Sequence, residues 1–123
     1  EAAMCAGKHG LDNLTIMVDY NKIQSYGETQ VVQDLEPLAD KWRAFNFNVR
    51  QVDGHNCQQL KDSFGSLPFE AGKPSAIICH TVKGKGIPMA EHDPTWHHKS
   101  RLSPEHIEEL FQALGGQNAA DLS

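Results

Sequence analysis

The stretch LTIMVDYNKIQS, residues 14–25, decides the fold that we expect for this chain. Its first five residues form an apolar, partly β-branched run, the pattern of a short strand buried on both faces of a parallel sheet. The run stops at Asp19, and Asn21 and Ile23 follow within four residues. Open α/β sheets bind ligands at the carboxyl ends of their strands. The sequence therefore predicts a binding site within residues 19–25.

Helix and strand patterns alternate along the rest of the chain. The predicted helices cover residues 1–9, 37–45, 57–67 and 104–114, and the predicted strands cover residues 14–18, 49–52 and 76–79. Residues 20–34 lack periodicity and are expected to be loop, and residues 82–101 form a long irregular segment of the kind that is usually functional. This order predicts an α/β fold with a parallel sheet and right-handed crossovers. Only three strands are expected, so the sheet edges need cover from further sequence or from another chain, and dimerisation is expected.

Three inward-facing apolar stripes support the predicted helices. The second helix is expected to face the sheet through Leu38, Trp42 and Phe45. The stripe of the third is Leu60, Phe64 and Leu67, and the inward residues of the last are Ile107, Leu110, Phe111 and Leu114. Gly10 is expected to stop the first helix, and Asn56 is expected to cap the third. The last helix is expected to begin at Ser103 and to stop at Gly115 and Gly116.

Composition excludes several classes of partner. The net charge of −5 argues against nucleic acid or an anionic membrane as a partner, because both require a basic surface. The three cysteines have no metal-type spacing and suit a reducing compartment. No apolar run reaches the length of a membrane span, and no signal peptide is evident. We therefore expect a cytoplasmic protein.

Five motifs together resemble the thiamine diphosphate-binding domain of transketolases. They are DNLTIMVDYNKIQSYG (12–27), EPLADKWRAF (36–45), VDGH (52–55), HTVKGKG (80–86) and the WH pair (96–97), in the order of that family. The resemblance covers residues 1 to about 114 and is closest to the split form, whose N-terminal half is a separate subunit. It implies a thiamine diphosphate-binding fold of three αβα layers, with residues 1–123 as one partial PP-type domain. The chain begins inside a helix and lacks the family's G-D-G motif, so we expect it to be truncated at its N-terminus.

The resemblance also implies a cofactor site. Asn21 would supply a side-chain oxygen and Ile23 a backbone carbonyl to the Mg²⁺ (or Ca²⁺) that accompanies thiamine diphosphate. Lys83 would lie beside the cofactor, and His97 would contact the diphosphate and the substrate end of the thiazolium ring as a catalytic residue. The family's third protein ligand to the metal, the aspartate of G-D-G, is absent from these residues.

The activity implied by the resemblance is transfer of a two-carbon ketol unit from a ketose to an aldose, both as sugar phosphates. The glutamate that activates the aminopyrimidine ring lies in another domain of the family, so a C-terminal transketolase subunit is an expected partner, in a homo- or hetero-oligomer. These 123 residues alone are expected to be inactive. The alternatives are another thiamine diphosphate enzyme, such as a deoxyxylulose phosphate synthase or a dehydrogenase E1 component, and a non-catalytic scaffold domain.

Two positions depart from the family pattern. The family has glycine after the WH pair, where this chain has His98, and many relatives have aspartate where this chain has Tyr26. A zinc site is not expected, because Cys79 and the nearby histidines show no short-spaced double-ligand pattern.

Overall fold

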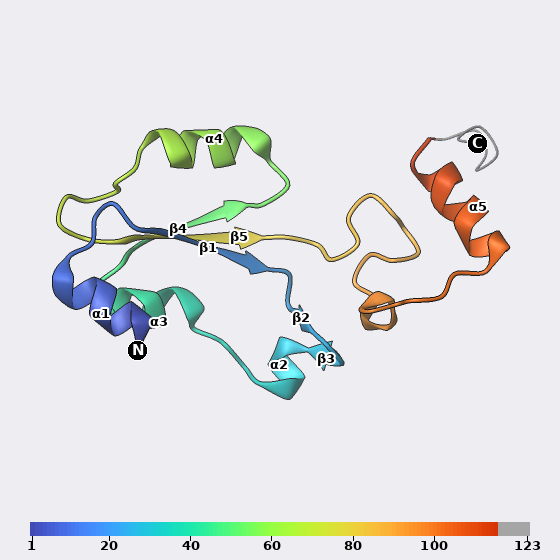
Figure 1. Cartoon of the computed structure of the whole chain (residues 1–123), viewed down its shortest axis with the longest axis horizontal. Coiled ribbons are helices and arrows are strands. Elements are labelled where there is room, and N and C mark those ends of the chain that lie inside the picture. Colours follow the sequence, from blue (N-terminus) through green and yellow to red (C-terminus); the bar gives the residue numbers. More distant parts are fainter. Residues whose placement is uncertain (116–123) are drawn as a thin grey trace. The chain divides into compact units, whose positions relative to one another are not determined.

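The computed structural model describes residues 1–115, which form two compact units (Figure 1). The first unit contains Glu1–Asn21 and Gln33–Thr81, and the second contains Lys22–Val32 and the described residues from Val82 to Gly115. The prediction of one domain over residues 1–123 includes Gly116 and the residues after it, which lie outside the described part.

A parallel three-stranded sheet is the centre of the first unit. Its strands β1 (Thr15–Tyr20), β4 (Asn48–Asp53) and β5 (Ser75–His80) lie in the order β1-β5-β4. The register is level, since Thr15 and Asn48 both pair with Ser75. The carboxyl ends of all three strands therefore lie side by side, at one end of the sheet. The predicted parallel sheet is confirmed. Strands β4 and β5 extend one residue beyond the predicted runs at each end, and β1 begins one residue later and ends two residues later than predicted.

Helices cover both faces of this sheet. Helices α1 (Ala2–His9) and α3 (Leu38–Ala44) lie on one face and α4 (Cys57–Gly65) on the other (Figure 1). The fully buried Ile78 packs with Tyr20 and Ala39 on the first face. Its neighbour Ile77, also fully buried, packs with Val52 and Leu60 on the second face, because successive strand side chains point to opposite sides. The result is the predicted three-layer αβα arrangement.

Helix boundaries follow the predicted stop and start residues. Gly10 ends α1 in a left-handed conformation, with φ of 58°, that glycine adopts without strain. The Asn56 side chain accepts hydrogen bonds from the backbone N–H groups of Gln58 and Gln59 at the start of α4. Ser103 accepts one from the backbone N–H of His106 in the last helix. These three predictions are confirmed.

The expectation that residues 14–18 are buried on both faces is wrong. Strand β1 lies at an edge of the sheet, and half of the Met17 side chain is exposed (50%). The central strand is β5, whose residues Ser75–His80 are buried except for the last. Both runs are apolar, and the apolar pattern alone does not decide which of two such strands lies in the middle.

Three of the predicted helix stripes are only partly inward. Helix α3 ends before Phe45, which is 41% exposed, and Phe64 in α4 is 45% exposed. Leu67 lies beyond the end of α4. In the last helix Ile107 is 36% exposed, and Leu114 lies after the helix and is 70% exposed. Phe45, Leu67 and Leu114 lie beyond the ends of their helices. Phe64 and Ile107 reach the surface from within theirs.

The second unit is built from short elements. Strands β2 (Ile23–Gln24) and β3 (Gly27–Glu28) form an antiparallel hairpin, followed by α2 (Thr29–Val32). The prediction that residues 20–34 are loop is therefore wrong in part: two-residue strands and a one-turn helix are too short to show periodicity. The 3₁₀-helix η1 (Pro94–Trp96) interrupts the long irregular segment, and α5 (Pro104–Ala113) follows it.

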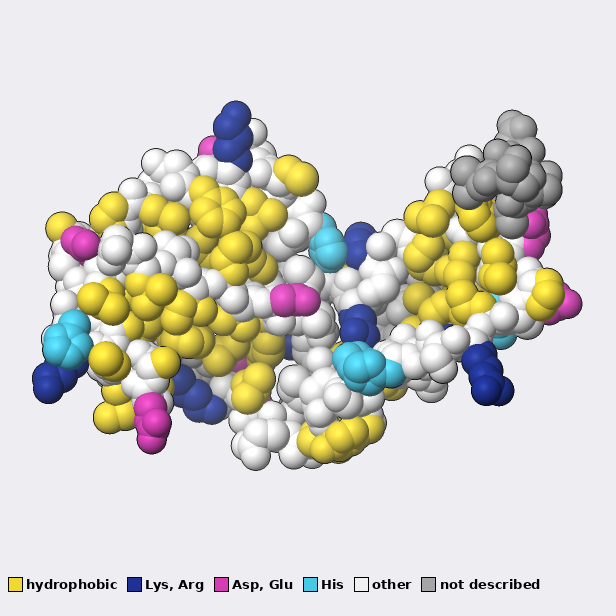
Figure 2. All heavy atoms as spheres, viewed as in Figure 1, with side chains coloured by type: hydrophobic (Ala, Val, Ile, Leu, Met, Phe, Trp, Pro, Cys, Tyr) yellow, Lys and Arg dark blue, Asp and Glu magenta, His cyan; other side chains and the backbone are white. Residues whose placement is uncertain are grey.

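Hydrophobic side chains reach the surface over the sheet and helices of the first unit (Figure 2). Besides those already named, Met4 is 61% exposed and Leu11 is 40% exposed. Among the described residues, no helix has both the length and the apolar character needed to cross a membrane.

Candidate functional site

The carboxyl end of β1 carries the predicted ligand Asn21 and a polar cluster around it. The Asn21 Nδ2 donates a hydrogen bond to Asp19 Oδ2 at 3.2 Å. The hydroxyl of Thr81, just after β5, donates to the other oxygen, Asp19 Oδ1. Asp19 therefore links the ends of the two neighbouring strands. It is exposed, and the sequence alone marked it only as the end of the strand.

The backbone turns sharply between the two predicted metal ligands. Lys22 has a φ of 69°, in the left-handed region that residues other than glycine seldom adopt. The Lys22 carbonyl accepts a hydrogen bond from the Thr29 N–H at 2.8 Å, and Ile23 pairs with Glu28 in the hairpin. Asn21 thus ends the first unit, and Ile23 begins the hairpin of the second.

The donor atoms of Asn21 and Ile23 fit a hard cation. An amide oxygen and a carbonyl oxygen are the ligands that Mg²⁺ and Ca²⁺ take, and Mg²⁺ usually completes its octahedron with water and phosphate oxygens. In residues 1–115 no group of three or more His, Cys, Asp or Glu side chains could hold a metal ion. A cation at this turn would therefore depend on a bound phosphate group for much of its coordination.

A second polar network lies at the same edge of the sheet and was missed by sequence analysis. The Tyr20 hydroxyl donates to Glu36 Oε1 at 2.7 Å, and Glu36 Oε2 accepts from the Leu38 N–H at 2.9 Å. Burial, and then the hydrogen bond to Glu36, raise the pKa of Tyr20 to about 12. Tyr20 therefore stays protonated and ties β1 to the start of α3. No sequence motif marked this pair, because its members are sixteen residues apart.

A shallow cavity of about 280 Å³ opens beside this edge. Asp19 and Thr81 line it together with Met17, Gly54, Leu60 and Cys79. Burial raises the pKa of the Cys79 thiol, and the negative charge of Asp19 adds to the effect. The thiol therefore stays protonated at neutral pH and has no nucleophilic character there.

The predicted loop of the second unit is fixed by its own backbone. Gly84 and Gly86 both have positive φ, 78° and 94°. The Lys83 carbonyl accepts from the His92 N–H at 3.1 Å, which closes the loop. Lys85 Nζ lies 3.5 Å from Glu91 Oε1. Lys85 is therefore paired with Glu91. The loop lysine whose charge affects the pKa of His97 is Lys83.

Lys83 and His97 are brought together within this unit. His97 is half-buried, and its Nδ1 has no hydrogen-bond partner among the described residues. Loss of solvent lowers the pKa of His97, and the positive charge of Lys83 and the neighbouring His98 lower it further. His97 is therefore neutral at pH 7, with one ring nitrogen available to donate and the other to accept.

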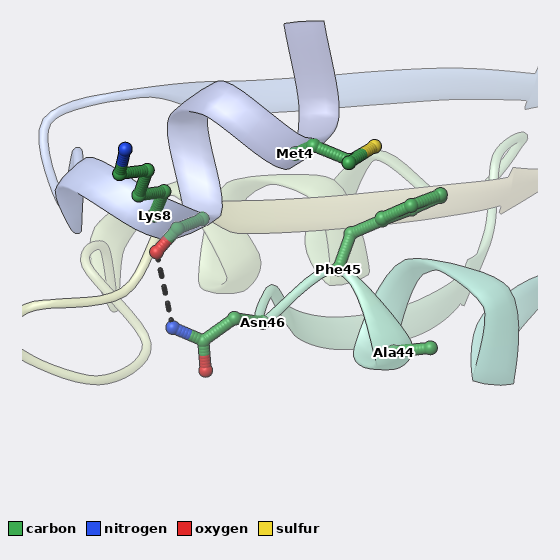
Figure 3. A pocket seen from close by; sticks show the side chains of 6 residues that line it. Met4, Lys8, Ala44, Phe45 and Asn46 are labelled. Carbon is green, nitrogen blue, oxygen red and sulfur yellow. Dashed lines mark hydrogen bonds between the residues drawn. The ribbon is translucent and has the colours of Figure 1, made fainter. Parts of the chain in front are cut away.

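A larger open hollow of about 600 Å³ lies elsewhere, between α1 and the end of α3 (Figure 3). Met4, Lys8, Phe45 and Asn46 are among its lining residues, and Asn46 Nδ2 donates to the Gly7 carbonyl at 3.2 Å. The hollow contains none of the predicted site residues and no set of groups suited to catalysis. It is a surface feature and not the candidate site.

Comparison with known proteins decides the family. Residues 1–122 match the family described as "Transketolase, thiamine diphosphate binding domain". The chain belongs to the transketolase family. It is 47% identical over 91 residues to a 6-deoxy-6-sulfo-D-fructose transketolase subunit of a Clostridium species, covering 74% of this chain and 33% of that protein. It is 38% identical over 98 residues to an apulose-4-phosphate transketolase subunit of Phocaeicola vulgatus, covering 80% of this chain and 35% of that protein.

Solved transketolase structures share the fold. The crystal structure of transketolase from Campylobacter jejuni matches with a TM-score of 0.79 and 26% identity, covering 94% of this chain and 18% of that one. Transketolase from Leishmania mexicana matches with a TM-score of 0.79 and 25% identity over 94% of this chain and 17% of that one. The family and the αβα fold predicted from the sequence are confirmed. The chain spans about a third of the length of the curated subunits that it matches.

The departure from the family pattern at His98 has a structural explanation. His98 has a φ of 58°, so the backbone is left-handed at the position where the resemblance led us to expect glycine. Histidine is one of the side chains found more often than most in this region. The ring of His98 lies 4.1 Å, centroid to centroid, from that of His97. The substitution therefore adds a second imidazole beside the predicted catalytic residue.

Proposed function

We propose that this chain supplies the magnesium and diphosphate contacts of a thiamine diphosphate-dependent transketolase subunit. In this proposal Asn21 gives its side-chain oxygen and Ile23 its carbonyl oxygen to Mg²⁺, with Ca²⁺ as an alternative ion. The observation that carries the proposal is the left-handed turn at Lys22, which separates two oxygen donors directly after a parallel strand. Such a strand end is where open α/β sheets bind phosphorylated ligands.

His97 and Lys83 have distinct roles in the proposal. Lys83 provides a positive charge near the diphosphate. Loss of solvent around His97, and then this charge, lower the pKa of His97 below the ordinary histidine value. A neutral His97 can donate a hydrogen bond to a phosphate or substrate oxygen and can accept a proton at its other nitrogen. When bound, thiamine diphosphate supplies the carbanion chemistry that breaks and forms the carbon–carbon bond of the ketol unit.

A partner subunit completes the proposed enzyme. Relatives that match this chain are named as subunits of transketolases, one acting on a sulfonated sugar and one on a sugar phosphate. We propose that this chain works with a C-terminal transketolase subunit on phosphorylated or similarly anionic sugars, within an oligomer. The three unpaired cysteines are consistent with a cytoplasmic location.

Two variants test the proposal in the complete subunit together with its partner. Asn21→Ala removes one metal oxygen and should weaken binding of Mg²⁺ and thiamine diphosphate about tenfold or more, measured by calorimetric titration. His97→Ala should lower turnover more than it lowers cofactor affinity, because a proton-transfer group contributes typically 10²- to 10⁴-fold to rate. Equal cofactor affinity of the Asn21 variant and the parent would rule out the metal assignment. Unchanged steady-state rates would rule out the role of His97.

A further inference from the structure

We propose that Asp19, held by Thr81, is a positioning residue that sets the orientation of the Asn21 amide. This inference rests on the proposed function, in which the Asn21 oxygen binds the divalent cation. It adds two residues, outside the pair of proposed ligands, that decide whether the oxygen or the nitrogen of the amide is presented.

The geometry places Asp19 between the ends of two strands. One carboxylate oxygen, Oδ2, accepts from Asn21 Nδ2 at 3.2 Å, and the other, Oδ1, accepts from the Thr81 hydroxyl. Asp19 pairs with Cys79 in the register of β1 and β5, so Thr81 follows two residues beyond its partner. All four residues belong to the first unit. The carboxylate is therefore fixed from both sides by the sheet itself.

The chemistry of the two groups makes the orientation of the amide definite. An ionised carboxylate can only accept hydrogen bonds, so the amide must turn its nitrogen toward Asp19. Because the amide is planar, its oxygen then points away from the carboxylate. A primary amide that flips would instead offer its N–H₂ group to a cation, which repels it. Asp19 thus selects the one orientation of Asn21 in which the amide can be a metal ligand.

Thr81 has a separate part in this arrangement. Its hydroxyl holds Asp19 Oδ1 and leaves Oδ2 directed at Asn21. Loss of the hydroxyl would keep the charge of Asp19 but free its carboxylate to rotate. Groups that orient metal ligands in this way typically change metal affinity by 10- to 100-fold when they are removed.

Asp19 is exposed, so a purely structural role can be told apart from a positioning role. Exposed substitutions usually change stability only slightly. A positioning role requires that metal affinity falls while the melting temperature stays near that of the parent. It also requires that the effect acts through Asn21, so that the two substitutions are not additive.

The test measures Mn²⁺ affinity by electron paramagnetic resonance in the complete subunit with its partner, with thiamine diphosphate present. Asp19→Ala should weaken Mn²⁺ binding about 10- to 100-fold, and Thr81→Val should weaken it several-fold although the charge remains. Asp62→Asn, a charge-matched control on α4, should leave affinity unchanged within about twofold. The double variant of Asp19 and Asn21 should bind no more weakly than Asn21→Ala alone. Thr81→Val decides the question if Asp19→Ala lowers the melting temperature.

Each other outcome overturns the inference in a recognisable way. If Asn21→Ala weakens Mn²⁺ binding and Asp19→Ala does not, the positioning role is wrong and the proposed function stands. If the two effects add, Asp19 acts by its charge alone and does not orient Asn21. If neither variant changes affinity, the metal assignment itself fails, and the inference fails with it.

Discussion

The glycine pair in the HTVKGKG loop gives a matched test of how the loop is held. Gly84 and Gly86 both have positive φ. A Cβ added at Gly84 would lie 2.7 Å from the Ala90 carbonyl carbon and closer still to its oxygen, whereas one added at Gly86 would meet nothing within 4 Å. Gly84→Ala therefore imposes a conformational cost and a backbone clash, and Gly86→Ala imposes only the first.

The expected difference follows from these two terms. An L side chain in the left-handed region costs about 1–2 kcal/mol, and this applies to both variants. Forcing an extra methyl group into occupied space costs about 1–3 kcal/mol more, and this applies to Gly84 alone. We expect the loop of the Gly84 variant to open more easily than that of the Gly86 variant by about 2 kcal/mol. This corresponds to about 30-fold, since 1.4 kcal/mol is a factor of ten.

Hydrogen exchange at the His92 amide measures this opening, because its N–H donates to the Lys83 carbonyl across the loop. The His92 amide should exchange about 30-fold faster in Gly84→Ala than in Gly86→Ala. The same variant should raise the pKa of His97 toward the ordinary value, since a distorted loop moves the positive charge of Lys83 away from it. Equal exchange rates in the two variants would refute the close contact between Gly84 and Ala90.

Three further predictions concern the pKa of His97, the pH dependence of stability and the core. Lys83→Met should raise the pKa of His97, because it removes a positive charge that favours the neutral ring, whereas Lys85→Met should not; NMR titration of the histidine ring protons tests both. The pKa of His97 is lower in the folded protein than its ordinary value of 6.5, so the unfolded chain binds a proton more readily at this residue. The stability that the neutral His97 contributes is therefore fully present above pH 6.5 and is lost as the pH falls through the pKa of the folded state. Ile77→Ala should lower the free energy of unfolding by about 3 kcal/mol. Met17→Ala, at a half-exposed site, should lower it by much less. Equal losses of free energy in urea unfolding would contradict the assignment of β5 as the central strand.

The sequence predicted the strands of the first unit well because each is an unbroken apolar run closed by polar residues. It could not rank them: Ile16 to Val18 and Ala76 to Ile78 look equally buried by composition, and only the order β1-β5-β4 makes the second run central. Sheet order depends on contacts between segments that are far apart in the chain, and the apolar pattern of a single segment does not record them.

The candidate site was predictable only where a motif spans neighbouring residues. Asn21 and Ile23 stand in one turn, and the loop lysine and His97 stand in two short motifs. The links of Asp19 to Thr81, 62 residues apart, and of Tyr20 to Glu36 depend on the fold. Such long-range partners orient the functional groups, and no local pattern reveals them.

Some exposed apolar side chains of the first unit belong to helical patterns that are longer than the helices themselves. Phe45 follows the last residue of α3, where the amphipathic pattern continues beyond the helix itself. The helical stripes were therefore predicted in the right places but extended too far. In the proposed assembly, contacts with the partner subunit would account for part of this surface.

The central claim is that the turn after β1 offers the Asn21 side-chain oxygen and the Ile23 carbonyl oxygen to a divalent cation. Anomalous diffraction from crystals of the complete subunit with Mn²⁺ and thiamine diphosphate tests it most directly. We expect one manganese peak in contact with both oxygens, at a coordination distance near the roughly 2.1 Å that magnesium takes. A manganese peak bound to thiamine diphosphate but separated from both oxygens would contradict it.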